Sequence, residues 1–197
     1  MRHLVLAATW LMLVGCAPAF LHSAALPGRP VSDPGLVGEW VTSGDTVTRA
    51  TVSESEDPGM YRVALTIHHK GEFKSALTLD LTLAGSESAT FVDLFLAKPE
   101  REKLVGAYGF LVLPVHQVMK IARERNEVRL WPFNEQWLQR EGESYPSERM
   151  AIGGGETTVV TAPSEQVRDL LERHADDPNA FGDPIVFRRV APGESPP

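Results

Sequence analysis

Residues 73–83 read Phe-Lys-Ser-Ala-Leu-Thr-Leu-Asp-Leu-Thr-Leu. Every second position from 77 to 83 is a leucine, and polar residues stand between the leucines. Successive side chains of a β-strand point to opposite faces of the sheet, so this alternation predicts a strand with one buried and one solvated face. Phe73 is expected on the buried face with the leucines, and Asp80 on the solvated face.

A second strand precedes this one. Residues 61–67 alternate in the same way, with apolar residues at the odd positions, and the intervening segment 69–72 contains Gly71 and is typical of a turn. The two strands are therefore expected to pair as a hairpin. Further strands are predicted over residues 36–43, 46–53, 89–96, 107–115, 117–123, 127–133, 157–161 and 184–190. Many short strands joined by local turns are typical of an antiparallel meander that forms a barrel or a strongly curved sheet.

Two helices are predicted among these strands. Asn134 is a suitable N-cap for a short inserted helix that carries Trp137 and ends by Gly142. A C-terminal helix is predicted from Ser164, as its N-cap, to Ala175, because apolar residues recur there at helical spacing. The expected fold class is mainly β (α+β), with the C-terminal helix followed by a last strand.

The composition bounds the function. The chain has 197 residues, of which 43% are hydrophobic and 23% charged, with a net charge of −7 and one cysteine. These values fit one globular domain and argue against a disordered chain. A single cysteine excludes an intrachain disulfide, and the acidic balance makes nucleic acid an unexpected partner.

The N-terminus has the pattern of a secretion signal. Met1-Arg2-His3 is followed by an apolar run over residues 4–14, which is too short for a membrane-spanning helix of roughly 20 residues. The run ends Leu13-Val14-Gly15-Cys16, which resembles the lipobox of bacterial lipoproteins. The resemblance implies cleavage before Cys16 and acylation of this residue. Two alternatives stay open: an ordinary signal peptide cut after Ala24 or Ala25, and a buried cysteine that acts as a small apolar residue.

The same resemblance implies a location and a domain plan. Ala17, directly after the cysteine, favours the outer membrane of a bacterial envelope, with the membrane as partner through a lipid anchor at Cys16. The expected organisation is a signal peptide over residues 1–15, lipidated Cys16 with a Pro-rich tether over 16–35, one β-rich domain over 36–191 and a disordered tail over 192–197.

The first predicted strand begins Leu36-x-Gly38-x-Trp40. This start resembles the Gly-x-Trp signature of lipocalins, and it implies a lipocalin-like barrel in which the tryptophan packs across one end beneath a basic side chain. Arg188 or Arg189 on the last strand is the expected cation–π partner. Simple core filling by Trp40 is the alternative.

A further resemblance covers more of the chain. The segments Leu113–His116, Asn134–Leu138 and His174–Pro178 resemble a set of uncharacterised bacterial lipoproteins. This resemblance implies no activity.

The histidines do not form a metal-binding pattern. His68 and His69 are neighbours in a strand, so their side chains point to opposite faces and cannot bind one ion together. His116 is expected to be satisfied by a neighbour or to face solvent. His174 is expected to interact favourably with a helix C-terminus. Asp176 and Asp177 lie beyond that helix, where Asp-Pro is typical of a turn, and one short acidic pair falls well short of a calcium-binding EF-hand loop.

Nucleophilic and phosphate-binding motifs are not recognised either. Residues 85–88 lack the spacing of a nucleophile elbow, and Gly153-Gly154-Gly155 lacks the Lys-Ser/Thr of a phosphate loop. Asp80 and Asp93 are a conceivable carboxylate pair, but a solvated sheet face is the favoured interpretation. We therefore expect no enzymatic activity and no catalytic, cofactor-binding or metal-binding residue; Cys16 is the predicted functional residue.

Two functions remain ahead of a third. The first is a non-enzymatic module that binds a small apolar ligand, with lining residues over 108–113. The second is an envelope interaction or assembly factor that uses exposed Trp131, Phe133 and Trp137. A hydrolase with an unrecognised site is the third.

Overall fold

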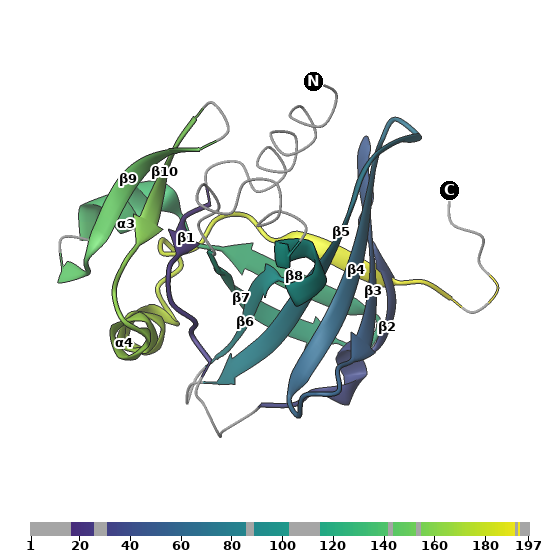
Figure 1. The fold of residues 1–197 in the computed structure, drawn as a ribbon, viewed down its shortest axis with the longest axis horizontal. Helices are drawn as coiled ribbons and strands as arrows, with labels where there is room; N and C mark the ends of the chain where they lie inside the picture. Colours follow the sequence, from purple (N-terminus) through teal and green to yellow (C-terminus); the bar gives the residue numbers. More distant parts are fainter. Residues whose placement is uncertain are drawn as a thin grey trace.

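The computed structural model describes residues 17–25, 31–85, 89–102, 115–141, 144–152 and 155–191, together with Gly193. Eight antiparallel strands close into a barrel, and a three-stranded sheet and helix α4 lie beside it (Figure 1). The mainly β, lipocalin-like architecture expected from the sequence is confirmed, and the meander closes.

The strands of the barrel follow each other along the chain, except for the last. Their order is β11 (Ile185–Arg189), β2 (Gly38–Val41), β3 (Thr46–Glu54), β4 (Met60–His69), β5 (Glu72–Gly85), β6 (Thr90–Leu96), β7 (Gln117–Glu124) and β8 (Glu127–Pro132). The smaller sheet has the order β1 (Ala19–Phe20), β10 (Gly155–Val160) and β9 (Ser147–Ile152). The helical elements that bear on the site are η1 (Pro34–Leu36), α3 (Glu135–Glu141) and α4 (Ser164–His174).

The β4–β5 hairpin confirms the alternation that predicted it. Leu81, Leu79 and Leu77 pair with alternate residues of β4, and their side chains belong to the core inside the barrel. The register shifts between Ile67 and His68, near the turn. Phe73 was expected on the buried face, and this expectation was wrong: beyond the shifted register its side chain is 60% exposed.

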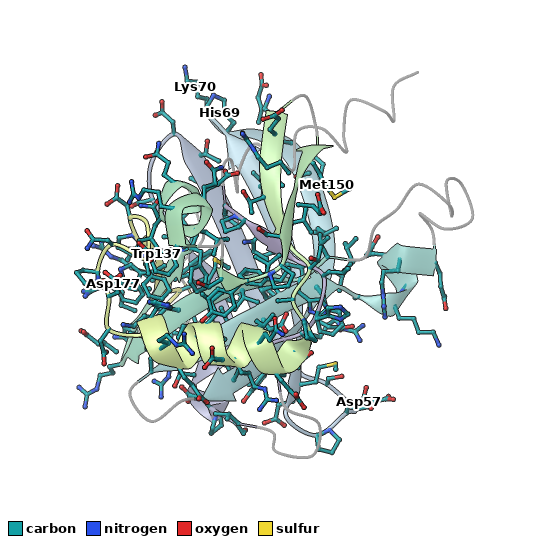
Figure 2. The ribbon with its side chains drawn as sticks, turned by 90° about the vertical axis from the view of Figure 1, so that its left-hand side faces the viewer. Asp57, His69, Lys70, Trp137, Met150 and Asp177 are labelled. Carbon is teal, nitrogen blue, oxygen red and sulfur yellow. The ribbon has the colours of Figure 1, made fainter. Side chains whose placement is uncertain are left out.

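The up-and-down topology sorts the connections to two ends of the barrel. The β2–β3 and β4–β5 turns and the β6–β7 and β8–β11 connections lie at one end, which we call the hairpin end. The β3–β4, β5–β6 and β7–β8 turns lie at the other, which we call the plug end because η1 packs there. Figure 2 shows the two ends by His69 and Lys70 on one side and Asp57 on the opposite side. The insertion that contains α3, β9, β10 and α4 departs from the hairpin end.

Two hydrophobic cores stabilise the fold. One fills the barrel, with side chains from every strand of the closed sheet. The other lies outside the barrel, between its wall and the inserted elements, and α4 contributes Val167, Leu170 and Leu171 to it. In Figure 2 α4 crosses the front of the barrel wall. The barrel wall is therefore buried on both of its faces, and each face contributes to one of the two cores.

The outer core overturns one expectation. Phe133 and Trp137 were expected to form an exposed patch with Trp131, but they are only 2% and 3% exposed. Phe133 packs against Phe20 and Phe181, with ring centroids 5.7 Å and 4.8 Å apart. The apolar stripe of the short helix therefore serves the core, and the predicted interaction patch does not exist as such.

The segment expected as a tether over residues 16–35 also differs from the prediction. Phe20 and Ala24 are fully buried, and β1 pairs in parallel with β10. Composition rich in proline and glycine suggested free chain, but proline restricts φ without preventing packing. Cys16, the predicted signal peptide and residues 26–30 lie outside the described residues, as does the predicted tail over 192–197 except Gly193.

The predicted ends of the two helices agree with the structure at α3 but not at α4. Asn134 caps α3 as expected, because its Oδ1 accepts the backbone N–H groups of Gln136 and Trp137 at 3.0 Å and 3.2 Å. Ser164 is not the cap of α4: Pro163 occupies that position and makes no side-chain bond. Strand β9 was not predicted, and most of the predicted strand 107–115 lies outside the described residues.

Candidate functional site

The interior of the barrel is the candidate site, and its plug end is closed by side chains. Arg189 is the last residue of β11, and its Cζ lies 4.2 Å from the ring centroid of Trp40. The Trp40 indole N–H donates to the Leu36 carbonyl at 2.8 Å. Arg189 also donates to the carbonyl groups of Val37, at 2.9 Å, and Gly35. Of the two arginines expected beside Trp40, Arg189 is the partner.

Gly38 makes this approach sterically allowed. Its φ of 137° is a backbone conformation that side-chain-bearing residues rarely adopt, and a Cβ there would lie 2.4 Å from Arg189 Nη1. The positive φ therefore favours glycine at this position, and the absence of a Cβ leaves room for the Arg189 guanidinium group. Arg188, the neighbouring residue, points the other way because successive side chains of a strand alternate, and its side chain is 74% exposed.

A second polar contact fastens η1 across the plug end. Asp33 accepts two hydrogen bonds from Arg123, at 2.7 Å and 3.0 Å, and one from the Gly35 N–H at 2.9 Å. The Arg123 hydrogen bonds lower the pKa of Asp33, and in turn the pKa of Arg123 is raised. The Asp33 N–H donates to the Tyr61 hydroxyl at 2.8 Å. The inward-facing polar groups of Tyr61 and Arg123 therefore bind Asp33 and fix η1 across this end of the barrel.

Toward the hairpin end the interior side chains are less completely buried. Side chains that pack on the interior core but are only partly buried are Val31, Leu65, Leu77, Leu94, Leu96, Leu130 and Ile185. Leu94, Leu96, Leu130 and Ile185 lie toward the strand ends at the hairpin end, whereas Val31 bridges to Leu83 near the plug end. Apolar side chains that a barrel interior leaves partly buried are suited to contact with an apolar molecule. The lining residues predicted over 108–113 lie outside the described residues.

Within the described residues, no buried charged side chain faces the barrel interior. Among the residues that the structure describes, the buried charged side chains are Asp80 and Asp93, and both face outward from the barrel. A solvated face was expected for these two carboxylates, and this expectation was wrong: they are 4% and 0% exposed. They do not act as a carboxylate pair either, because Asp80 is engaged by Arg62 at 2.7 Å.

Asp93 forms the centre of a polar cluster on the outside of the barrel. Its Oδ2 accepts the Ser23 hydroxyl at 2.6 Å and the Ala24 N–H at 2.9 Å, and its Oδ1 lies 2.7 Å from His116 Nδ1. Nucleophilic activation needs a base that receives the serine proton, normally a histidine between serine and aspartate. Here the aspartate lies between the other two, so the cluster ties the N-terminal segment to β6 and is structural.

Comparisons with known proteins do not assign a function to this chain. No family model, no curated protein and no solved structure matches the chain.

The other predicted residues occupy structural positions. His69 Nδ1 lies 3.0 Å from the Thr46 hydroxyl, and His68 packs edge-on against Phe73. In the described part of the chain, no group of three or more His, Cys, Asp or Glu side chains is arranged to hold a metal ion. No helix within the described ranges is long and apolar enough to cross a membrane.

The motif around His174 belongs to the outer core. His174 ends α4 and meets the Trp137 ring edge-on, with centroids 4.8 Å apart. The Trp137 indole donates to Asp177 Oδ2 at 3.1 Å, and the two residues lie side by side in Figure 2. Hydrogen bonds from Asn179, and a weaker one from the Trp137 indole, lower the pKa of Asp177. Through these contacts Trp137 connects α3 to the C-terminal end of α4 and to the turn that follows it.

Proposed function

We propose that the protein is a lipid-anchored component of a bacterial envelope whose barrel binds a small apolar ligand without catalysis. The observation that carries the proposal is the gradient inside the barrel. One end is closed by Trp40 and Arg189, and toward the other end most of the inward-facing aliphatic side chains are only partly buried. An apolar molecule that covered Leu94, Leu96 and Ile185 would gain about 25 cal/mol for each Å² removed from water.

The packing of residues 17–25 supports processing at Cys16. Cleavage after Ala24 or Ala25 would remove Phe20 and Ala24, which are both fully buried in the outer core, and would remove β1 from its sheet. Cleavage before Cys16 leaves all of these residues in the mature chain. The Leu13-Val14-Gly15-Cys16 sequence supplies the recognition motif, and Ala17 favours the outer membrane.

A pair of adjacent residues tests the binding site. Ile185 packs on the interior core, whereas Val186, the next residue of β11, faces outward; both are half-buried. We expect Ile185→Gln to weaken the affinity for a fatty acid, measured with a fluorescent analogue, roughly tenfold. About 1–2 kcal/mol of apolar contact with the ligand is lost in this variant. Val186→Gln is the matched control and is expected to bind as the unmodified protein does.

Native mass spectrometry of the protein purified under mild conditions provides the second test. A retained apolar molecule, or uptake of an added fatty acid, supports the proposal. A protein that is empty and takes up no fatty acid, or two variants with equal losses, would contradict ligand binding in the barrel.

A further inference from the structure

The chain that leads to Cys16 is held at the hairpin end. Gln117, the first residue of β7, donates from Nε2 to the Pro18 carbonyl at 2.9 Å. Phe20 and His116 exchange two backbone hydrogen bonds, of 2.9 Å and 2.7 Å. Both contacts lie where the β6–β7 connection enters the barrel. Cys16 is separated from this packed segment by Ala17 alone, so an acyl chain on Cys16 would start close to this end.

The β4–β5 hairpin extends at the same end. It reaches beyond the rest of the barrel in Figure 1, and Figure 2 shows His69 and Lys70 at its tip. The tip carries Lys70, Lys74 and the 60% exposed side chain of Phe73. Lys74 is paired with Glu72 at 2.7 Å, whereas no described carboxylate forms an ion pair with Lys70. An exposed aromatic ring beside lysines is typical of protein segments that enter a membrane interface.

A second exposed apolar side chain flanks the exit point. Met150 on β9 is 38% exposed, and its register partner is Thr157 on β10. The Thr157 hydroxyl donates to the Ala17 carbonyl at 3.4 Å. Phe73 and Met150 are two of the three large hydrophobic side chains that are exposed in the described residues, and the third is Val37.

The β3–β4 turn at the plug end differs from the tip of the β4–β5 hairpin. It carries Glu54, Glu56 and Asp57, which are all exposed, and no lysine, whereas the β4–β5 tip combines Lys70 and Lys74 with Glu72. Anionic headgroups attract lysines and repel carboxylates, so the β4–β5 tip is the better suited of these two turns to a membrane surface.

We propose that the hairpin end of the barrel rests on the lipid bilayer that holds the acylated Cys16. Phe73 enters the headgroup region, Lys70 contacts lipid phosphates, and Met150 touches the same surface beside the anchor. The short link from Cys16 to Ala17 prevents the domain from turning its plug end to the membrane. This inference rests on the lipid anchor of the proposed function, but not on the binding of a ligand inside the barrel.

Two matched variants test the orientation. Glu72→Cys and Asp57→Cys each replace an exposed acidic residue at opposite ends of the barrel, the first at the start of β5 and the second in the β3–β4 turn. The full chain is expressed with its own leader, so that an acylated Cys16 leaves the new cysteine as the only free thiol for an environment-sensitive dye. The labelled proteins are placed in vesicles of phosphatidylcholine and phosphatidylglycerol that contain a lipid spin-labelled near its headgroup.

We expect several-fold stronger quenching of the dye at position 72 than at position 57. Adding Phe73→Ser or Lys70→Glu to the Glu72→Cys variant is expected to reduce this quenching at least twofold. Equal quenching at the two positions, stronger quenching at position 57, or no effect of the added substitutions would overturn the proposed surface.

Mass spectrometry of the same samples shows whether Cys16 is acylated, so that the proposed orientation and the proposed anchor can be judged separately. An acylated Cys16 with no preference for position 72 overturns the orientation and leaves the anchor and the ligand-binding proposal standing. An unmodified Cys16 in the mature chain overturns the anchor and the orientation together. Fatty-acid displacement by the same protein reports on the barrel independently of both.

Discussion

The guanidinium group of Arg189 lies over the indole ring of Trp40, with Cζ 4.2 Å from the ring centroid. The two residues are register partners on β11 and β2, the last and first strands of the barrel along the chain. Their contact therefore closes the sheet and covers one end of its interior at the same time.

We expect Arg189→Ala to destabilise the protein by about 2–3 kcal/mol. The substitution removes a cation–π contact of about 0.5–2 kcal/mol and leaves the carbonyl groups of Val37 and Gly35 without a donor. Urea unfolding followed by tryptophan fluorescence measures the loss. Arg188→Ala is the control and should change stability by less than about 0.5 kcal/mol, because that side chain is on the outer surface. Similar losses in the two variants would contradict the assignment of Arg189.

Gly38→Ala should destabilise the protein by about 1–3 kcal/mol through backbone strain and the clash with Arg189. Gly44→Ala isolates the strain alone, because Gly44 also has a positive φ, of 112°, but a Cβ there would meet no atom within 4 Å. The cost of Gly38→Ala should fall when Arg189→Ala is also present. A double-mutant cycle from urea unfolding measures this coupling, and strict additivity of the two losses would contradict the steric role of Gly38.

Asp33 gives stability a defined pH dependence. Its pKa is lowered from 3.8 by the hydrogen bonds from Arg123, so the folded state binds this proton less readily than the unfolded state does. The stabilisation is therefore present above about pH 4 and is lost as the pH falls through the lower folded-state pKa. Chemical unfolding between pH 7 and pH 2 should show a steeper acid loss for the unmodified protein than for Asp33→Asn.

Arg123→Gln provides the control for this titration. It removes the group that lowers the pKa of Asp33, so its acid loss should resemble that of Asp33→Asn. An unchanged acid slope in both variants would show that the pair does not govern stability in this range.

Trp137 should behave as a core residue. Trp137→Ala is expected to cost about 3–5 kcal/mol, whereas Trp137→Phe should cost less, about 1–3 kcal/mol, because one aromatic ring is kept while the indole N–H to Asp177 and part of the ring volume are lost. In variants that keep one tryptophan in the domain, acrylamide should quench Trp131 more strongly than Trp137. Strong quenching of Trp137 would restore the surface patch that its burial rules out.

Asp93 should hold the N-terminal segment against the barrel. Asp93→Ala removes the acceptor of the Ser23 hydroxyl and the Ala24 N–H and the partner of His116, so we expect a loss of about 3 kcal/mol or more. Hydrogen exchange should increase first in residues 17–25. Exchange that rises equally throughout the barrel would contradict this local role.

Part of the candidate site was predictable because strand alternation is a local property. The leucines of residues 77–83 face the interior, as their spacing predicted, and Trp40 lies at one end of the barrel. The Asp93 cluster was not predictable, because Ser23 and Asp93 are 70 residues apart and neither has a neighbouring motif. Only the closure of the sheet and the path of the N-terminal chain bring them together.

The amino-acid sequence by itself determined most strands of the barrel, the inward-facing positions of residues 77–83 and the lipobox-like segment that ends at Cys16. These features depend on neighbouring residues, since covalent geometry places alternate side chains on opposite faces of a strand. The tertiary structure decided which residues are partners. Register selected Arg189 over Arg188 for Trp40, a shift in register exposed Phe73, and packing against the barrel wall buried Phe20. Each of these outcomes depends on segments distant in the chain, whose contacts form only when the barrel closes.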